Sequence, residues 1–180
     1  MKQENEKEIL YRGNYLQLVK KQNWEWVERV NCSGVVMMLG MTAERKVILV
    51  EQYRVSLGKN VIEFPAGLVG DQDKAENLET AARREFLEET GYTAERWTLL
   101  MDGPPSAGMS SETVSIFLAE ALKKVGAGGG DESEKITVHE VELSQVEEWL
   151  WTRRREGTAV DPKVYSGLYF LLAAKEPAPA

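Results

Sequence analysis

Short apolar runs, continuous or alternating with polar residues, predict strands over the first third of the chain. Residues 9–30 alternate enough to form two or three short strands, in EILYRG, LQLVKK and WEWVERV. Residues 34–39 (GVVMML) and 47–53 (VILVEQY) are typical of buried strands, with a polar turn at 42–46 between them. Another short strand is predicted over 60–64, and Pro65-Ala66-Gly67 ends it.

Helical spacing first appears at residues 77–90, and strands dominate again after it. Strands are predicted over 96–101 and 113–120, joined by the Gly/Pro/Ser loop 102–112. A further strand is predicted over 136–143. The chain therefore contains more strands than helices.

Two helices are predicted near the end of the chain. The first starts at a cap on Ser144, with Glu147 completing a capping box, and runs through Arg154. The last opens at 161 or 162 and ends near residue 174. Few and late helices beside many strands predict an α+β fold, a mixed-sheet sandwich with helices on both faces.

The helix at 77–90 places carboxylates on its apolar side. Asn77 is its expected N-cap and Gly91 its C-terminal stop. Glu85 and Glu89 fall within about 20° of the centre of the apolar arc, and Glu88 lies at its edge. The arc itself consists of Leu78, Ala81, Ala82 and Phe86.

This placement fits a metal site better than a solvated charged face, because solvated glutamates should lie opposite the apolar stripe. Burying lone carboxylates costs several kcal/mol or forces them to protonate. Carboxylates three and four residues apart converge and can share a cation, and their hard oxygens suit Mg²⁺ or Mn²⁺. Arg84 is the expected counter-charge.

Composition limits the other possibilities. The chain has 180 residues, 43% of them hydrophobic, enough for one domain with a core. Its net charge of −7 argues against a broad nucleic-acid-binding surface. Cys32 is the only cysteine, so no internal disulfide forms, and we expect it to be buried. The single histidine, His139, excludes a multi-histidine zinc site and is expected to be structural.

No segment resembles a targeting or membrane signal. The N-terminus (MKQENEKEIL) lacks the apolar core of a signal peptide. No run approaches the ~20 apolar residues that cross a bilayer. We therefore expect a cytoplasmic protein with no membrane partner. Residues 126–134 (GAGGGDESE) are expected to form a mobile acidic loop, and the tail 175–180 to be disordered.

The helix lies inside a longer motif. Residues 70–92 fit the pattern G-x5-E-x7-R-E-U-x-E-E-x-G-U at every fixed position, where U is a bulky apolar residue. The residues at these positions are Gly70, Glu76, Arg84, Glu85, Phe86, Glu88, Glu89, Gly91 and Tyr92. This stretch resembles the signature of the Nudix hydrolases; only Tyr92, where an aliphatic residue is commoner, departs from it.

The resemblance implies the Nudix fold, an α/β/α sandwich around a mixed sheet. It also implies that Glu85 and Glu89 are catalytic metal ligands, with Glu88 and the backbone carbonyl of Ala66 beside them. Arg84 would orient the glutamates, and Glu76 would be a structural group. Gly70 and Gly91 would shape the loop and the helix end.

The flanking segments narrow the resemblance to ADP-ribose and nucleoside diphosphate sugar pyrophosphatases. They are WEWVER (24–29), EQYRV (51–55), VIEFPAGLV (61–69) and PPSAGMSSETVSIFLAE (104–120). By this resemblance Trp24 stacks on the base, Arg29 and Arg54 contact phosphate, and Glu63 and Glu112 also bind substrate. Trp24 could instead be an interface aromatic, and Arg54 an ordinary ion-pair partner. The inserted Ala107 and Met109 leave the sugar specificity open.

The same subfamily places a catalytic base on a loop that corresponds to ESEKITVHEV (132–141). Glu132 and Glu134 are the candidates, Glu140 is a weaker third, and a solvated linker is the alternative for this segment. The resemblance also implies a homodimer, with residues 1–33 as an N-terminal antiparallel β element contributing to it and residues 34–180 as the hydrolase domain.

These residues together predict Mg²⁺-dependent hydrolysis, with Mn²⁺ as a possible substitute, of the diphosphate linkage in ADP-ribose and related nucleoside diphosphate sugars. The products would be a nucleoside monophosphate and a sugar phosphate. Three alternatives stay open: another or broader sugar specificity such as GDP-mannose, a non-catalytic ADP-ribose sensor, and an mRNA-decapping enzyme. The acidic balance disfavours the last, and the intact motif disfavours the sensor.

Overall fold

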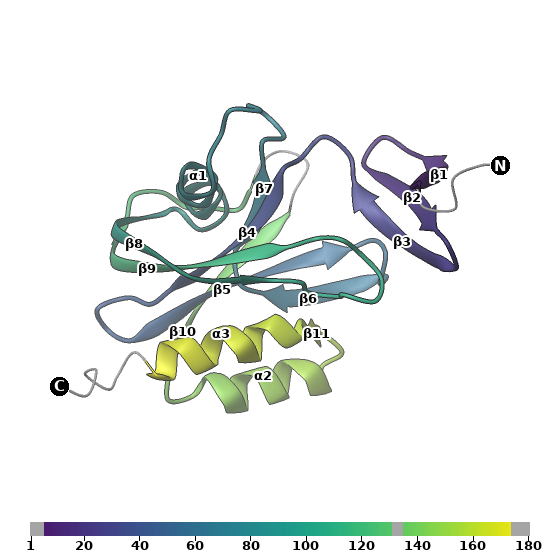
Figure 1. Cartoon of the computed structure of the whole chain (residues 1–180). Helices are drawn as coiled ribbons and strands as arrows, with labels where there is room; N and C mark the ends of the chain where they lie inside the picture. Colours follow the sequence, from purple (N-terminus) through teal and green to yellow (C-terminus); the bar gives the residue numbers. More distant parts are fainter. Residues whose placement is uncertain (1–5, 131–134, 174–180) are drawn as a thin grey trace.

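Two four-stranded sheets and three helices make up the main body of the protein in the computed structural model, which describes residues 6–130 and 135–173 (Figure 1). The expectations for Glu132, Glu134 and the tail fall outside these residues. One sheet has the order β7-β4-β9-β8, formed by Ala66–Val69, Gly34–Gly40, Val114–Lys124 and Tyr92–Gly103. The other has the order β10-β5-β6-β11, formed by Ile136–Glu142, Lys46–Arg54, Lys59–Glu63 and Ala159–Val160.

Helices cover both sides of these sheets. The α1 helix (Leu78–Thr90) lies on one side, and α2 (Val146–Arg155) and α3 (Pro162–Ala173) lie together on the other (Figure 1). The β4–β9 and β6–β11 pairs are parallel and the remaining pairs are antiparallel, so both sheets are mixed. This arrangement confirms the predicted α+β sandwich.

The side chains of β4 point alternately to the two faces of its sheet, and this divides the core into two parts. Val36 and Met38 pack with Phe86 of α1, whereas Met37 and Leu39 pack with residues of α2 and α3. Successive residues of a strand point to opposite faces, so a strand with helices on both sides must be apolar throughout. That requirement explains the continuous apolar run at 34–39.

A separate three-stranded antiparallel sheet precedes this body and stands to one side of it (Figure 1). Its strands are β1 (Glu8–Arg12), β2 (Leu16–Lys21) and β3 (Trp24–Arg29). Val27 joins β3 to the loop before β9, accepting from the Ser111 N–H at 3.2 Å and donating to the Met109 carbonyl at 2.9 Å. Tyr11 and Trp24 on this sheet are 69% and 72% exposed.

The strand and helix predictions are largely confirmed, with three corrections. Pro65-Ala66-Gly67 does not end the sheet, because Ala66–Val69 pairs with β4 as β7. The Ser144 cap is wrong: the chain turns first, with Gln145 N–H bonded to the Glu142 carbonyl at 2.9 Å, and α2 starts after Gln145 without a side-chain cap. The short β11 was not foreseen.

The remaining corrections concern single segments. Cys32 is half-exposed rather than buried. Of the segment 126–134, expected to be a mobile acidic loop, the structure describes residues 126–130, and the backbone N–H groups of Gly126, Gly129 and Gly130 donate to carbonyls at the end of α1. Within residues 6–130 and 135–173, none of the helices combines the length and apolarity that crossing a bilayer requires.

Candidate functional site

The α1 helix has the predicted caps. The Asn77 carboxamide accepts from the Thr80 N–H at 2.9 Å, which satisfies one of the free donors of the first turn. Gly91 ends the helix with a φ of 73°, a left-handed conformation that glycine adopts without steric cost. These caps fix both ends of the helix that carries the glutamates.

The glutamates lie where the helical projection places them. Glu89 is only 2% exposed and accepts from the Ala66 N–H of β7 at 3.1 Å. The Glu85 side chain is 13% exposed and the Glu88 side chain 47%. Glu85 lies so close to Gly67 that a Cβ there would meet its Cδ at 2.0 Å. A glycine in β7 therefore makes room for the carboxylate.

Arg84 holds this group of acids together. Its guanidinium donates to Glu76 at 2.9 and 3.0 Å, to Glu85 at 2.9 Å and to Glu88 at 3.3 Å. It also donates to the Leu68 carbonyl of β7 at 3.2 Å. Hydrogen bonds with Glu76 are the main cause of a raised pKa for Arg84, so the guanidinium stays charged and orients the carboxylates.

The carboxyl group of Glu85 has a raised pKa. Burial raises its pKa to about 7, although the Arg84 charge acts in the opposite direction. Glu76 behaves differently: hydrogen bonds from Arg84 hold its pKa below the ordinary value. Glu85 is thus an acid that a further positive charge would shift toward its ionised form.

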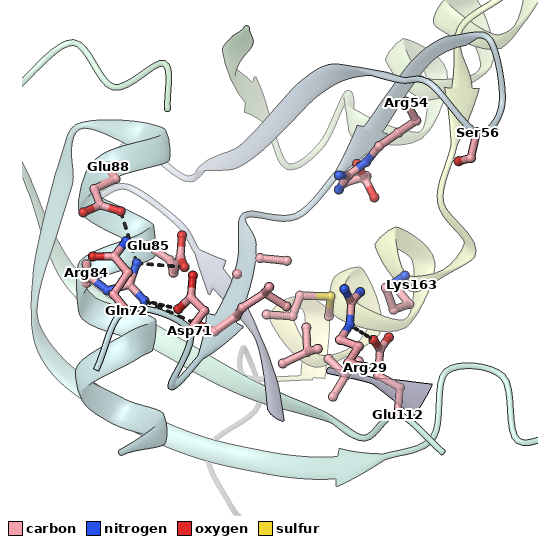
Figure 2. Close-up of a pocket in the computed structure, with 17 residues that line it drawn as sticks. Arg29, Arg54, Ser56, Asp71, Gln72, Arg84, Glu85, Glu88, Glu112 and Lys163 are labelled. Atoms are coloured by element: carbon pink, nitrogen blue, oxygen red, sulfur yellow. Dashed lines mark hydrogen bonds and ion pairs between the residues drawn. The ribbon is translucent and has the colours of Figure 1, made fainter. Parts of the chain in front are cut away.

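A cavity of about 510 Å³ opens in front of these acids (Figure 2). Glu85 and Glu88 lie with Asp71 on one wall, and Arg29, Arg54 and Lys163 lie across the opening. Arg54 donates to Glu63 at 2.7 Å, Arg29 pairs with Glu112, and Lys163 pairs with Asp161. One wall therefore offers carboxylates grouped around an arginine, and the other offers three cations, each beside one carboxylate.

A second hollow of about 420 Å³ adjoins the first and shares Arg29, Glu112 and Lys163 with it. Its lining comes from the loop before β9 and from β2, β3 and α3. The apolar residues of that lining are Leu16, Val27, Pro105, Met109 and Pro162. A charged cavity beside a mainly apolar hollow suits a ligand with a polar centre and a less polar end.

The structure brings together most, but not all, of the expected substrate residues. Arg29, Arg54, Glu63 and Glu112 line the cavity, whereas Trp24 is not among the described residues that line it. The sequence did not single out Lys163, Asp71, Gln72 or Ser56, which also line it. No local pattern marks these four, because only the tertiary fold brings them to the opening.

The weaker candidates lie elsewhere. Glu140 accepts hydrogen bonds from the Tyr92 hydroxyl and Lys124, both at 2.7 Å. His139 lies 2.8 Å from Glu51 and packs on the Trp149 ring, as expected of a structural residue. Neither Glu140 nor His139 is among the residues that line the cavity.

The residues fit a hard divalent cation by the chemistry of their donors. In the described part of the chain, no three His, Cys, Asp or Glu residues converge in a ready-made metal cluster. Arg84 donates hydrogen bonds to both Glu85 and Glu88. Yet burial raises the pKa of Glu85 to about 7 even beside Arg84, so a further cation would favour its ionised form. Carboxylate oxygens and a backbone carbonyl are the ligands that Mg²⁺ and Mn²⁺ prefer.

Several known proteins are similar to this chain in sequence or in fold. The NUDIX domain family model matches residues 33–164. An ADP-ribose pyrophosphatase of Bacillus subtilis (strain 168) is 37% identical over 144 residues, which cover 76% of each chain. A methanol dehydrogenase activator of Bacillus methanolicus is 35% identical, covering 71% of this chain and 68% of that protein.

A GDP-mannose pyrophosphatase of Escherichia coli (strain K12) is 34% identical, covering 71% of this chain and 70% of that protein. The crystal structure of an ADP compounds hydrolase superposes with a TM-score of 0.59 at 20% identity, over 79% of this chain and 80% of that one. This superposition confirms the expected fold.

Proposed function

The chain belongs to the Nudix family, and from that premise we propose that it hydrolyses the diphosphate linkage of ADP-ribose and related nucleoside diphosphate sugars. The products are a nucleoside monophosphate and a sugar phosphate. The observation that carries this proposal is the cavity itself, where Glu85 and Glu88 face Arg29 and Arg54 across the opening. The 37% identity to an ADP-ribose pyrophosphatase supports the substrate class.

Mg²⁺ is the proposed cofactor, with Mn²⁺ as a substitute. Glu85, Glu88, Glu89 and the carbonyl of Ala66 would hold it. The bound ion supplies charge neutralisation at the phosphoryl oxygens and makes a coordinated water more acidic. Arg84 keeps the carboxylates oriented through its hydrogen bonds to Glu85 and Glu88, which would share their oxygens with a bound cation.

The opposite wall binds the diphosphate. Arg29 and Arg54 match the geometry of phosphate oxygens through paired N–H donors. Each now donates to a carboxylate, Glu112 and Glu63 respectively. When a phosphate takes those donors, both carboxylates become acceptors for ligand hydroxyl groups, which explains how acids can belong to a site for an anion.

Two further assignments complete the proposal. Glu132 or Glu134 takes the proton from the attacking water; both lie outside the described residues. The N-terminal sheet contributes to a homodimer in which Trp24, 72% exposed in the single chain, stacks on the substrate base. Substitution of each loop glutamate by glutamine at saturating Mg²⁺ tests the first: if neither variant loses more than about tenfold in turnover, the base lies elsewhere.

The deciding experiment is a screen of nucleoside diphosphate sugars with Mg²⁺ in ¹⁸O-water, with the products read by mass. ADP-ribose should yield AMP and ribose 5-phosphate, and the label identifies the phosphorus attacked. GDP-mannose belongs in the same screen because a GDP-mannose pyrophosphatase is also a relative. If no nucleoside diphosphate sugar is hydrolysed, the proposal fails.

The matched control for that screen is Glu89→Gln, which keeps the size of the side chain and removes its charge. Loss of one metal-binding carboxylate should lower turnover by orders of magnitude while the fold survives. Binding of ADP-ribose without turnover by the unaltered protein would support the sensor alternative instead.

A further inference from the structure

A run of glycines about forty residues beyond α1 closes the end of that helix. The last carbonyls of any α-helix have no partner within it. Here the Glu89 carbonyl accepts from the Gly129 N–H at 2.8 Å, and the Glu88 carbonyl accepts from the Gly130 N–H at 3.1 Å. The segment after β9 thus supplies hydrogen-bond donors to the backbone carbonyls of Glu88 and Glu89, the last two glutamates of the site.

The contact continues past the helix end and is formed by backbone against backbone. The Gly91 carbonyl accepts from the N–H groups of Val125 at 2.8 Å and Gly126 at 3.0 Å. A Cβ on Gly128 would lie 2.4 Å from the Thr90 carbonyl carbon, and a Cβ on Gly91 would lie 2.3 Å from the Gly126 oxygen. Only glycines on both sides allow the two segments to come this close.

We propose that Gly126–Gly130 is a positioning element of the hydrolytic site, which holds the last turn of α1 in the place where Glu88 and Glu89 would bind the cation. The inference rests on the proposed metal-dependent function of that site. Backbone shifts of about 1 Å in a site can lower turnover by about a hundredfold, so a tight external cap on this turn has a catalytic consequence.

Two glycines of the chain provide a matched test. Gly129 and Gly157 have φ angles of 115° and 98°, so alanine is strained at both. A Cβ would have room at both, with the Ile136 oxygen 3.8 Å away at Gly129 and nothing within 4 Å at Gly157. Gly157 lies after α2, away from the cavity. The two alanine variants therefore introduce similar strain, and only one introduces it beside α1.

The first measurement is the affinity for Mn²⁺ in the absence of substrate. Electron paramagnetic resonance detects the binding, at a temperature well below the unfolding temperature of each variant. Gly129→Ala should lower Mn²⁺ affinity by about tenfold or more, as loss of a group that orients metal ligands does. Gly157→Ala should keep the wild-type affinity, although its unfolding temperature also falls. In hydrolysis assays Gly129→Ala should lower kcat and leave KM unchanged.

The second measurement needs no metal. Hydrogen exchange over residues 86–91 in metal-free protein should speed up in Gly129→Ala and stay unchanged in Gly157→Ala. Gly128→Ala should show both effects more strongly; if that variant does not fold, the matched pair decides alone.

The inference is overturned if Gly129→Ala and Gly157→Ala have the same Mn²⁺ affinity and the same exchange rates. This holds also when both variants lose affinity equally, because an equal loss would reflect general destabilisation. Failure of the wild type to hydrolyse any nucleoside diphosphate sugar overturns the proposed function instead, and leaves the exchange comparison intact.

Discussion

Glu85 combines burial with a position beside Arg84, and its pKa of about 7 makes metal-free protein sensitive to pH. The folded value lies above the ordinary 4.5, so the folded state binds the proton more tightly than the unfolded chain. The stability contributed by this group is present below pH 4.5 and is lost as pH rises through about 7.

We therefore expect the unfolding temperature in EDTA to fall more steeply for the wild type than for Glu85→Gln as the pH rises from 4.5 through about 7. Saturating Mg²⁺ should flatten the wild-type profile, because the bound cation favours the ionised carboxylate. Parallel profiles for the two proteins in EDTA would contradict the assignment. Calorimetry at several pH values provides the measurement.

Lys163 is the cation of the cavity that no sequence motif marked. Its side chain belongs to the first turn of α3 and lines both hollows, paired with Asp161. Lys163→Met keeps the length of the side chain and removes the charge. We expect the KM for ADP-ribose to rise by about tenfold, the effect of one lost charged contact, with a smaller change in kcat.

The control for Lys163→Met is Lys123→Met, at an exposed position of β9 outside the cavity. Equal kinetics in the two variants would show that Lys163 does not touch the substrate. Arg29 and Arg54 would then bind the diphosphate alone.

At the scale of elements, α2 is attached to the sheet by a buried acid. Glu51 of β5 is 6% exposed and accepts hydrogen bonds from Asn60 of β6 at 3.0 Å and Arg153 of α2 at 2.8 Å, with His139 of β10 at 2.8 Å. Burial raises the pKa of Glu51, but these hydrogen bonds outweigh burial and leave it below the ordinary value. The stability that Glu51 contributes is present above pH 4.5 and is lost as pH falls further.

Glu51→Gln should therefore destabilise the protein by about 3 kcal/mol at neutral pH, because Arg153 would keep its charge without the buried partner. The loss relative to wild type should shrink below pH 4 to 5, where the wild-type carboxylate itself becomes protonated. Glu147→Gln, at an exposed position of α2, is the control. Urea unfolding at two pH values tests the difference, and an equal loss at both would contradict it.

Elements were predictable wherever local signals determine them. The α1 helix has its N-cap, its glycine stop and the metal-motif spacing in consecutive residues, so its ends and the placement of Glu85 and Glu89 are confirmed. The β7 strand was missed because Pro65-Ala66-Gly67 is typical of a turn, and only pairing with β4 makes it a strand. Lys163 and Asp71 were missed for a similar reason, since tertiary contacts alone bring them to the cavity.

The whole molecule consists of a helix-covered sandwich and a sheet that stands beside it (Figure 1). That sheet supplies Arg29 to the cavity, yet its strands expose a group of large apolar side chains: Ile9, Leu10, Tyr11, Leu16 and Trp24. Large exposed apolar side chains in one region indicate an interaction surface. We therefore place the proposed homodimer at this sheet.

Tyr11→Asp tests that placement, and α3 offers a matched control, because Tyr11 and Tyr169 are both 69% exposed. A charge buried in an interface opposes association, whereas a charge on a free surface does not. Tyr11→Asp should shift the protein from dimer to monomer in sedimentation experiments and lower ADP-ribose turnover, and Tyr169→Asp should do neither. If Tyr169→Asp alone dissociates the dimer, the interface lies on α3, and Trp24 cannot complete the site of a partner subunit in the proposed manner.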